Sequence, residues 1–171
     1  MTVGIYAGSF DPITYGHSSI IHDASQFCDQ VVVAIGVNPD KKYLFSLEER
    51  IEFIKTATKD FGNHILVKPF KGLLVDFVAG LKPIKNPSKL LIRGIRSAAD
   101  YDYEANLAVI NRSLYPLAKT ILLISQPETA MISSSMVKEI ARYGHDVRKY
   151  VHPIVAEALM EKFNEEPDDI L

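Results

Sequence analysis

The chain has 171 residues, of which 47% are hydrophobic, and this length and composition fit one globular domain. Nineteen basic residues nearly balance 21 acidic ones, which argues against a dedicated nucleic-acid binder, because such proteins usually carry a basic excess. No apolar run reaches the roughly 20 residues of a membrane span and no secretory signal is visible, so we expect a cytoplasmic protein without membrane partners.

Short apolar runs alternate with segments of helical periodicity along almost the whole chain. The runs are apolar at nearly every position, which is typical of strands buried on both faces of a parallel sheet; they cover residues 2–7, 30–37, 64–68, 89–92 and 120–124. Apolar spacings of three and four predict helices over residues 18–27, 47–59, 73–81, 98–114, 134–142 and 154–163.

This alternation predicts an α/β fold, with a single-domain, Rossmann-like, open parallel five-stranded sheet and helices on both faces. Residues 1–164 form the predicted domain, and residues 165–171 form an acidic tail. Ser46 and Glu49 predict a capping box at the start of the second helix. Leu107, Ile110 and Leu114 recur on one face of the fourth helix. In such sheets ligands bind beyond the carboxyl ends of the strands, so the loops that follow the strands carry the functional information.

The loop after the first predicted strand reads GSFDPITYGH, from Gly8 to His17. Gly8 allows a ligand to approach the backbone closely, and Ser9 offers a hydroxyl and an amide there. Gly16 lets the chain turn into a helix whose first turn contains His17. Free amides and the positive end of the helix dipole favour phosphate at this position, and a histidine there donates to a phosphoryl oxygen.

This string resembles the nucleotidyltransferase signature G-[ST]-F-D-P-x-[TH]-x-G-H, and Thr14 points to one branch of that superfamily. From the first strand to at least Lys138 the chain is similar to the phosphopantetheine adenylyltransferases, which catalyse the penultimate step of coenzyme A synthesis. The resemblance implies that ATP and 4′-phosphopantetheine react to give dephospho-coenzyme A and pyrophosphate. It further implies Mg²⁺ bound with ATP, a homo-oligomer that is typically a hexamer, and feedback binding of coenzyme A.

Two other loops concern the acceptor. Lys41 and Lys42 follow the second strand, and the resemblance places Lys42 on the acceptor phosphate, with Lys41 peripheral. Leu73 and Leu74 open the third predicted helix, where their pattern predicts core residues, and the resemblance implies a contact of Leu74 with the pantetheine arm.

The fourth strand ends in Arg93-Gly94-Ile95-Arg96. Arginines placed directly after a fully apolar strand rarely have a packing role, and their guanidinium groups fit phosphate oxygens in a bidentate manner. The resemblance implies that Arg93 holds the acceptor phosphate, that the next three residues lie against ATP, and that Glu104 contacts ATP.

The last informative loop runs from Thr129 into the helix that begins at Ser134. Its serines supply a helix cap and further hydroxyl and amide donors, a pattern that also fits simple capping. The resemblance implies that this element embraces the β- and γ-phosphates. The remaining nucleotide contacts that it implies are Ser9, Phe10, His17, Thr129, Ala130, Met131, Ile132, Ser133, Ser134 and Ser135, and the catalytic residues are His17, Lys42 and Arg96.

No base of the Ser-His-Asp type accompanies these loops, and the acceptor phosphate needs none because it is already anionic. The four histidines other than His17 show no metal-ligand spacing with each other or with Cys28, the only cysteine, so we expect no protein metal site. The first loop alone also fits a sister nucleotidyltransferase with another acceptor, such as nicotinate mononucleotide or glycerol phosphate. A non-catalytic nucleotide sensor on the same scaffold is the second alternative.

Overall fold

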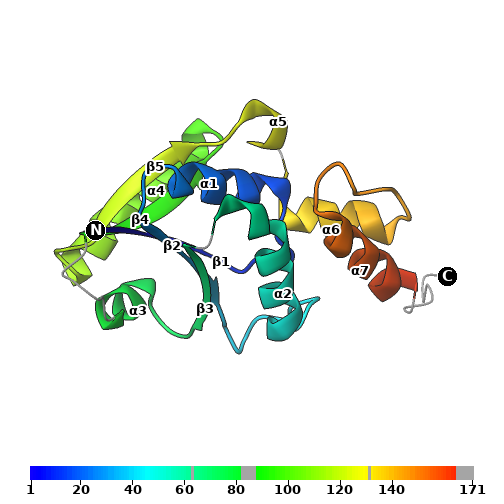
Figure 1. Cartoon of the computed structure of the whole chain (residues 1–171), viewed down its shortest axis with the longest axis horizontal. Helices are drawn as coiled ribbons and strands as arrows, with labels where there is room; N and C mark the ends of the chain where they lie inside the picture. The colour runs from blue at the N-terminus through cyan, green and yellow to red at the C-terminus, as the bar shows by residue number, and fades with distance from the viewer. Residues whose placement is uncertain (63, 82–87, 131, 165–171) are drawn as a thin grey trace.

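The computed structural model describes residues 1–62, 64–81, 88–130 and 132–164. Within these ranges five strands form one sheet in the order β3-β2-β1-β4-β5, and every neighbouring pair is parallel (Figure 1). The strands are β1 (Thr2–Gly8), β2 (Gln30–Gly36), β3 (Ile65–Phe70), β4 (Ser88–Ile95) and β5 (Lys119–Ile124). The predicted five-stranded parallel sheet is therefore confirmed.

The helices follow the predicted alternation, with differences at their ends. They are α1 (Tyr15–Ser25), α2 (Leu47–Ala57), α3 (Leu74–Gly80), α4 (Ala98–Leu114), α5 (Pro127–Ala130), α6 (Ser134–Arg142) and α7 (Pro153–Asn164). The predicted second helix ends early and is followed by a short 3₁₀ helix, η1 (Lys59–Phe61). The predicted capping box is present, because the Ser46 hydroxyl accepts from the Glu49 amide while the Glu49 carboxylate accepts from the Ser46 amide. None of the helices in the described ranges is long and apolar enough to cross a membrane.

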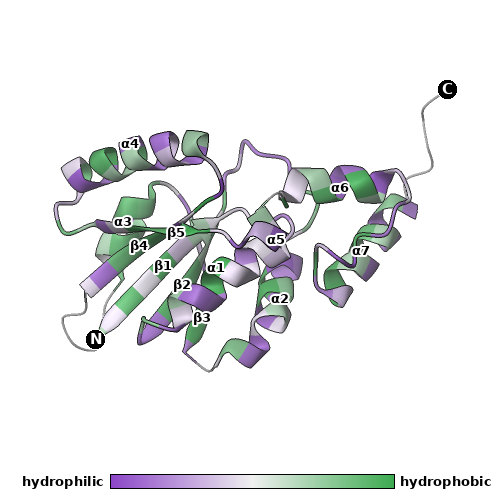
Figure 2. Ribbon diagram, turned by 90° about the horizontal axis from the view of Figure 1, so that it is seen from above, coloured by the Kyte–Doolittle hydropathy of each residue, from purple (hydrophilic) through white to green (hydrophobic). Residues whose placement is uncertain are grey.

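Helices cover both faces of the sheet, as predicted. Alternate residues of β2 point to opposite faces: Val31, Val33 and Ile35 pack in the core formed with α1 and α2, whereas Val32 and Ala34 pack with α3. Figure 2 shows α3 and α4 on one side of the sheet and α1 and α2 on the other. Helices α6 and α7 pack on each other beyond the sheet, and α7 contacts α2 (Figure 1).

Helix α4 shows a difference from the predicted pattern. The apolar stripe that includes Ile110 and Leu114 does not enter the core of the single chain, since these residues are 54% and 58% exposed. Glu104 is the only buried residue of this helix. Ile110 and Leu114 therefore face outward, whereas Leu107 is half-buried and lines a cavity described below.

Three stretches that the sequence singles out fall outside the described residues. They are Met131, the acidic tail 165–171, and residues 82–87 of the segment 82–88, which we expect from the resemblance to be longer than the corresponding connection in the family.

The Lys89 side chain of β4 caps the carboxyl end of α3. Its ammonium donates to the carbonyl oxygens of Val78 at 2.5 Å and of Leu81 at 2.8 Å, at a helix end, where the last carbonyl groups have no partner within the helix. Because hydrogen bonds to charged groups contribute about 1.5–3 kcal/mol, we expect Lys89→Met to lower the free energy of unfolding by about 2 kcal/mol in urea titrations. The matched variant Lys119→Met removes an exposed lysine and should change it by less than about 0.5 kcal/mol. Equal losses in the two variants would contradict the capping role of Lys89.

Candidate active site

Two cavities meet where the strand order reverses, between the carboxyl ends of β1 and β4. The first, of about 240 Å³, lies between these strand ends and helices α1, α4 and α6. The second, of about 640 Å³, lies beyond the ends of β1, β2 and β3. Ala7, Gly8 and Arg93 line both. Ligands of open α/β sheets bind at this switch point, and two cavities with a common wall suit two reactants.

His17 lines the first cavity from the first turn of α1. The Thr14 backbone N–H donates to Nδ1 of His17 at 3.0 Å, so Nδ1 is an acceptor and the proton of the neutral ring lies on Nε2. Burial, and to a smaller extent the charge of Arg96, together lower the pKa of His17 from its ordinary 6.5 to about 4. The ring is therefore a neutral N–H donor at physiological pH.

This pKa has a consequence for stability. As the pH falls, the unfolded chain protonates His17 near pH 6.5, whereas the folded protein does so only near pH 4. The contribution of neutral His17 is therefore complete above about pH 6.5 and is lost as the pH falls toward 4. We expect the free energy of unfolding to fall more steeply between pH 6.5 and 4.5 in the wild type than in His17→Ala. Urea titrations across this range measure it, and parallel pH profiles would contradict the assignment.

The loop that carries His17 is fixed by buried contacts. Phe10 is 2% exposed and packs edge-on against the His17 ring, with 5.2 Å between centroids. Its side chain belongs to the core, so the contact with ATP implied for Phe10 is available only through its backbone. Buried Asp11 accepts from the amides of Leu44 and Phe45, each at 3.0 Å, and thereby ties this loop to the one before α2.

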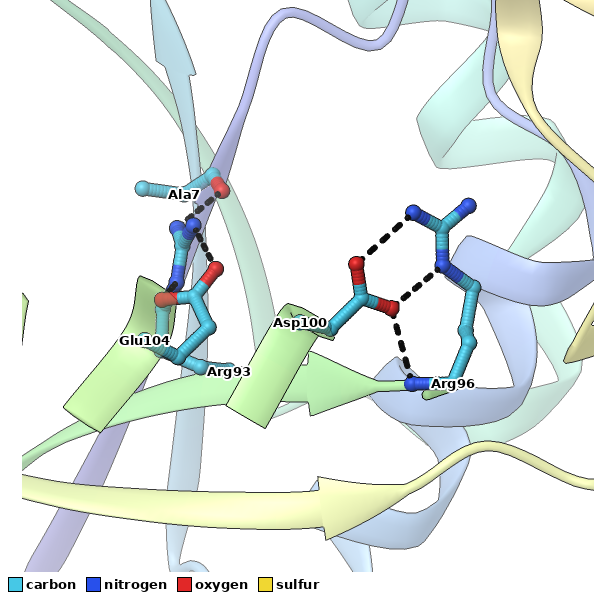
Figure 3. Close-up of polar contacts among 5 residues, drawn as sticks. All are labelled: Ala7, Arg93, Arg96, Asp100 and Glu104. Atoms are coloured by element: carbon cyan, nitrogen blue, oxygen red, sulfur yellow. Dashed lines mark hydrogen bonds and ion pairs between the residues drawn. The ribbon is translucent and has the colours of Figure 1, made fainter. Parts of the chain in front are cut away.

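Arg93 and Glu104 form a bidentate ion pair between β4 and α4 (Figure 3). Both hydrogen bonds are 2.6 Å long, and Arg93 donates a third to the carbonyl oxygen of Ala7 at 3.2 Å. Burial by itself lowers the pKa of Arg93, but the hydrogen bonds and charge of Glu104 raise it above its ordinary value. Both carboxylate oxygens of Glu104 are engaged, so it positions Arg93 at the wall between the cavities rather than offering a free carboxylate.

Arg96 lies in a different environment from Arg93. It pairs with Asp100 one helical turn away, at 3.0 Å, and lines only the first cavity together with Gly94 (Figure 3). The Arg96 side chain is 44% exposed, so this pair is open to solvent and exchanges partners more readily than the buried pair of Arg93.

Ser133 and Ser134, at the start of α6, line one end of the first cavity. Ser133 caps this helix by accepting from the Met136 amide at 3.1 Å, and Ser134 donates to the Pro12 carbonyl at 2.7 Å. Thr129 and Ile132 also line the cavity. Five predicted nucleotide contacts within the described residues are not among its lining residues: Ser9, Phe10, Ile95, Ala130 and Ser135.

The second cavity contains Ser9 and Leu74 as predicted for the acceptor, but its lysine is Lys41. The Lys41 ammonium donates to the Ser9 hydroxyl at 3.3 Å. Lys42 lines a separate hollow, so the structure does not bring it together with Ser9, Leu74 and Arg93. The reason is local: the side chain and carbonyl of Asn38 accept from the next amides, Asp40 at 2.9 Å and Lys41 at 3.2 Å, and this turn returns Lys41 to β1. The asparagine of the Asn-Pro-Asp sequence is the signal that could have selected Lys41.

The chain is similar to known proteins over most of its length. Residues 5–140 match the cytidylyltransferase-like family. The phosphopantetheine adenylyltransferase of Caldanaerobacter subterraneus is 45% identical over 163 residues, which cover 95% of this chain and 98% of that protein. That of Heliobacterium modesticaldum is 41% identical over 165 residues, covering 96% and 95%. The chain belongs to the phosphopantetheine adenylyltransferase family.

Solved structures show the same fold at lower identity. Plasmodium falciparum nicotinic acid mononucleotide adenylyltransferase, in complex with NaAD, superimposes with a TM-score of 0.71 at 20% identity and covers 96% of this chain and 99% of its own. A bifunctional NMN adenylyltransferase/ADP ribose pyrophosphatase from Francisella tularensis gives 0.74 at 15% identity, over 95% of this chain and 50% of its own. At these identities the likeness concerns the fold alone.

Proposed function

We propose that residues 1–164 form an enzyme that transfers the adenylyl group of ATP to the phosphate of 4′-phosphopantetheine, giving dephospho-coenzyme A and pyrophosphate. The observation that carries the proposal is the pair of cavities that share Ala7, Gly8 and Arg93 as a common wall. The near full-length relatives at 41–45% identity bear the name of this activity.

The nucleotide occupies the first cavity in this proposal. The start of α6 supplies free amides and the positive end of its dipole to the β- and γ-phosphates, and Arg96 adds a charge beside them. The acceptor occupies the second cavity, with its phosphate between Lys41, Ser9 and Arg93 and its pantetheine arm along Leu74. Arg93 has five N–H groups and uses three, so two remain for the acceptor phosphate.

The reaction needs no protein base. An anionic oxygen of the acceptor attacks the α-phosphorus of ATP, the bond from that phosphorus to the bridging oxygen breaks, and pyrophosphate leaves with the electron pair. Charge grows on the α-phosphoryl oxygens, where the Nε2–H of neutral His17 donates. Lys41 and Arg93 offset the repulsion between the two anions, and the two cavities hold them in line.

Mg²⁺ accompanies the triphosphate in this proposal and neutralises part of its charge. Asp100 and Glu104 line the first cavity, but each is engaged by an arginine. No group of three or more possible metal ligands occurs among the residues that the structure describes. The residues of this chain would contribute positioning and hydrogen bonds to the nucleotide, and Mg²⁺ would supply charge neutralisation there.

The exposed stripe of α4 supports a homo-oligomer. Val109, Ile110 and Leu114 are 71%, 54% and 58% exposed on the same helix, an arrangement that a second copy of the chain would cover. We propose a hexamer, as the family resemblance implies. Sedimentation analysis of the wild type and of Ile110→Glu tests this, and a monomeric wild type would contradict it.

Acceptor profiling tests the proposed activity. Pyrophosphate release from ATP is measured with 4′-phosphopantetheine, nicotinate mononucleotide and glycerol 3-phosphate in parallel, with coenzyme A added as the feedback ligand that the family implies. Of the three acceptors, we expect only 4′-phosphopantetheine to support pyrophosphate release, and we expect coenzyme A to lower the rate of that release. Release with another acceptor would support a sister nucleotidyltransferase, and nucleotide binding without release under all conditions would support a sensor.

A further inference from the structure

A third hollow, of about 480 Å³, lies outside both cavities, between the residues that follow Lys41 and helices α6 and α7. Its polar lining consists of Lys42, Ser135, Lys138, Glu139 and Arg142, and Phe163 of α7 forms part of its wall. We call it the basic hollow. The proposed reaction makes no use of these side chains.

Within the described part of the chain, two of its three cations have no acidic partner. Among the residues that the structure describes, Lys42 and Arg142 form no ion pair. The third cation, Lys138, is bound to Asp11 at 2.9 Å, and one of its three N–H groups is used there. Glu139 is the single carboxylate of the lining. The excess of donors and positive charge therefore favours an anion.

Two of the cations, Lys138 and Arg142, are held by side-chain contacts before any ligand arrives. Burial by itself raises the pKa of Asp11, but hydrogen bonds from two amides and from Lys138 hold it below its ordinary value, so Asp11 stays ionised beneath Lys138. The Arg142 guanidinium lies over the Phe163 ring, 5.3 Å from its centroid, and this contact leaves its N–H edge for hydrogen bonding. Lys42 belongs to the loop that Asp11 fixes through the Leu44 amide.

The basic hollow shares a lining residue with the second cavity, and it includes the residue that follows two lining residues of the first. Ser133 and Ser134 line the first cavity, whereas the next serine, Ser135, lines the hollow. Tyr43 lines both the hollow and the second cavity.

We infer that the basic hollow is a separate site for a small phosphate-bearing anion, with Lys42 and Arg142 as its main contacts and Lys138 as a fixed third cation. The ligand is either the pyrophosphate that the reaction releases or free inorganic phosphate. The first of these sources rests on the proposed function, whereas the site itself does not.

Calorimetric titration tests the site. The full chain is first saturated with α,β-methylene-ATP, which cannot react and reports nucleotide binding independently, and with 4′-phosphopantetheine, so that both cavities are filled. Pyrophosphate and inorganic phosphate are then titrated in turn. We expect one further equivalent of anion to bind. The double variant Lys42→Gln/Arg142→Gln should weaken this binding at least tenfold, and the matched variant Lys59→Gln/Arg148→Gln, which lies outside the hollow, should change it by less than twofold.

Absence of anion binding to the nucleotide-loaded protein would overturn the proposal, and so would equal affinity in the two double variants at unchanged melting temperature. Product inhibition by pyrophosphate identifies the source. If the hollow receives the leaving group, inhibition weakens in Lys42→Gln/Arg142→Gln by the same factor as binding. If it serves inorganic phosphate, phosphate binding weakens and product inhibition keeps its wild-type strength. Failure of the proposed function would instead appear as absence of pyrophosphate release with intact anion binding.

Discussion

His17→Ala is expected to lower kcat about 100- to 1000-fold, the usual cost of removing one preorganised donor to a developing negative charge. Affinity for ATP should change by less than about threefold, because the donor acts on charge that grows in the transition state. The neutral Nε2–H tautomer, fixed by the Thr14 amide on Nδ1, is the physical basis of this expectation. Steady-state pyrophosphate release and titration with α,β-methylene-ATP measure the two quantities.

His22→Ala is the matched control, because His22 lies on the same helix but its side chain is 51% exposed. It should retain kcat within about twofold. His17→Ala also leaves the Thr14 amide without its partner, so we expect a loss of about 1 kcal/mol in stability and compare rates well below the melting temperature. Unchanged turnover in His17→Ala, or equal losses of kcat and ATP affinity, would remove His17 from the catalytic role.

Arg93→Ala is expected to have the largest combined effect on stability and binding. Its partner Glu104 is 9% exposed at the side chain, and removal of one member of a buried ion pair typically costs about 3–5 kcal/mol. Because the Arg93 side chain is itself 23% exposed, we expect about 3 kcal/mol, measured by urea unfolding. The KM for 4′-phosphopantetheine should rise at least tenfold, since the bidentate phosphate contact is lost.

Arg96→Ala is the comparison that separates the two arginines. The ion pair of Arg96 with Asp100 is open to solvent, so its loss should cost less than about 1 kcal/mol. Arg96→Ala should mainly raise the KM for ATP, because Arg96 lines only the first cavity.

The double variant Arg93→Ala/Glu104→Ala should be more stable than the sum of the two single losses predicts, because neither charge is then left without its partner. An effect of Arg93→Ala on ATP affinity alone would reverse the assignment of the two arginines.

The fold was predictable from the sequence because a buried parallel sheet leaves a strong signal. Strands rich in β-branched residues alternate with helical patterns along the chain. This alternation predicts strand–helix–strand units, whose connections between parallel strands are right-handed. The ends of elements were less predictable: α1 begins at Tyr15, before the predicted start, because the Thr14 amide binds the His17 ring. Periodicity contains no information about this contact.

The site was predictable as a set of loops but not as a set of contacts. Lys41 and Lys42 are adjacent in sequence, and only the Asn38 turn decides which one faces Ser9. Arg93 and Arg96 look equivalent, yet one is buried against Glu104 and the other is open to solvent. The sequence predicts the apolar stripe of α4, but periodicity does not distinguish a face that packs in the core from one that remains exposed.

The stereochemical course at the α-phosphorus is the most direct test of the central claim, a single in-line transfer between two neighbouring cavities. ATP made chiral at that phosphorus by sulfur and oxygen isotope substitution is reacted with 4′-phosphopantetheine, and the configuration of the product is determined by ³¹P NMR. One direct displacement predicts inversion. Retention would contradict the account, because it requires two displacements and therefore an adenylylated intermediate.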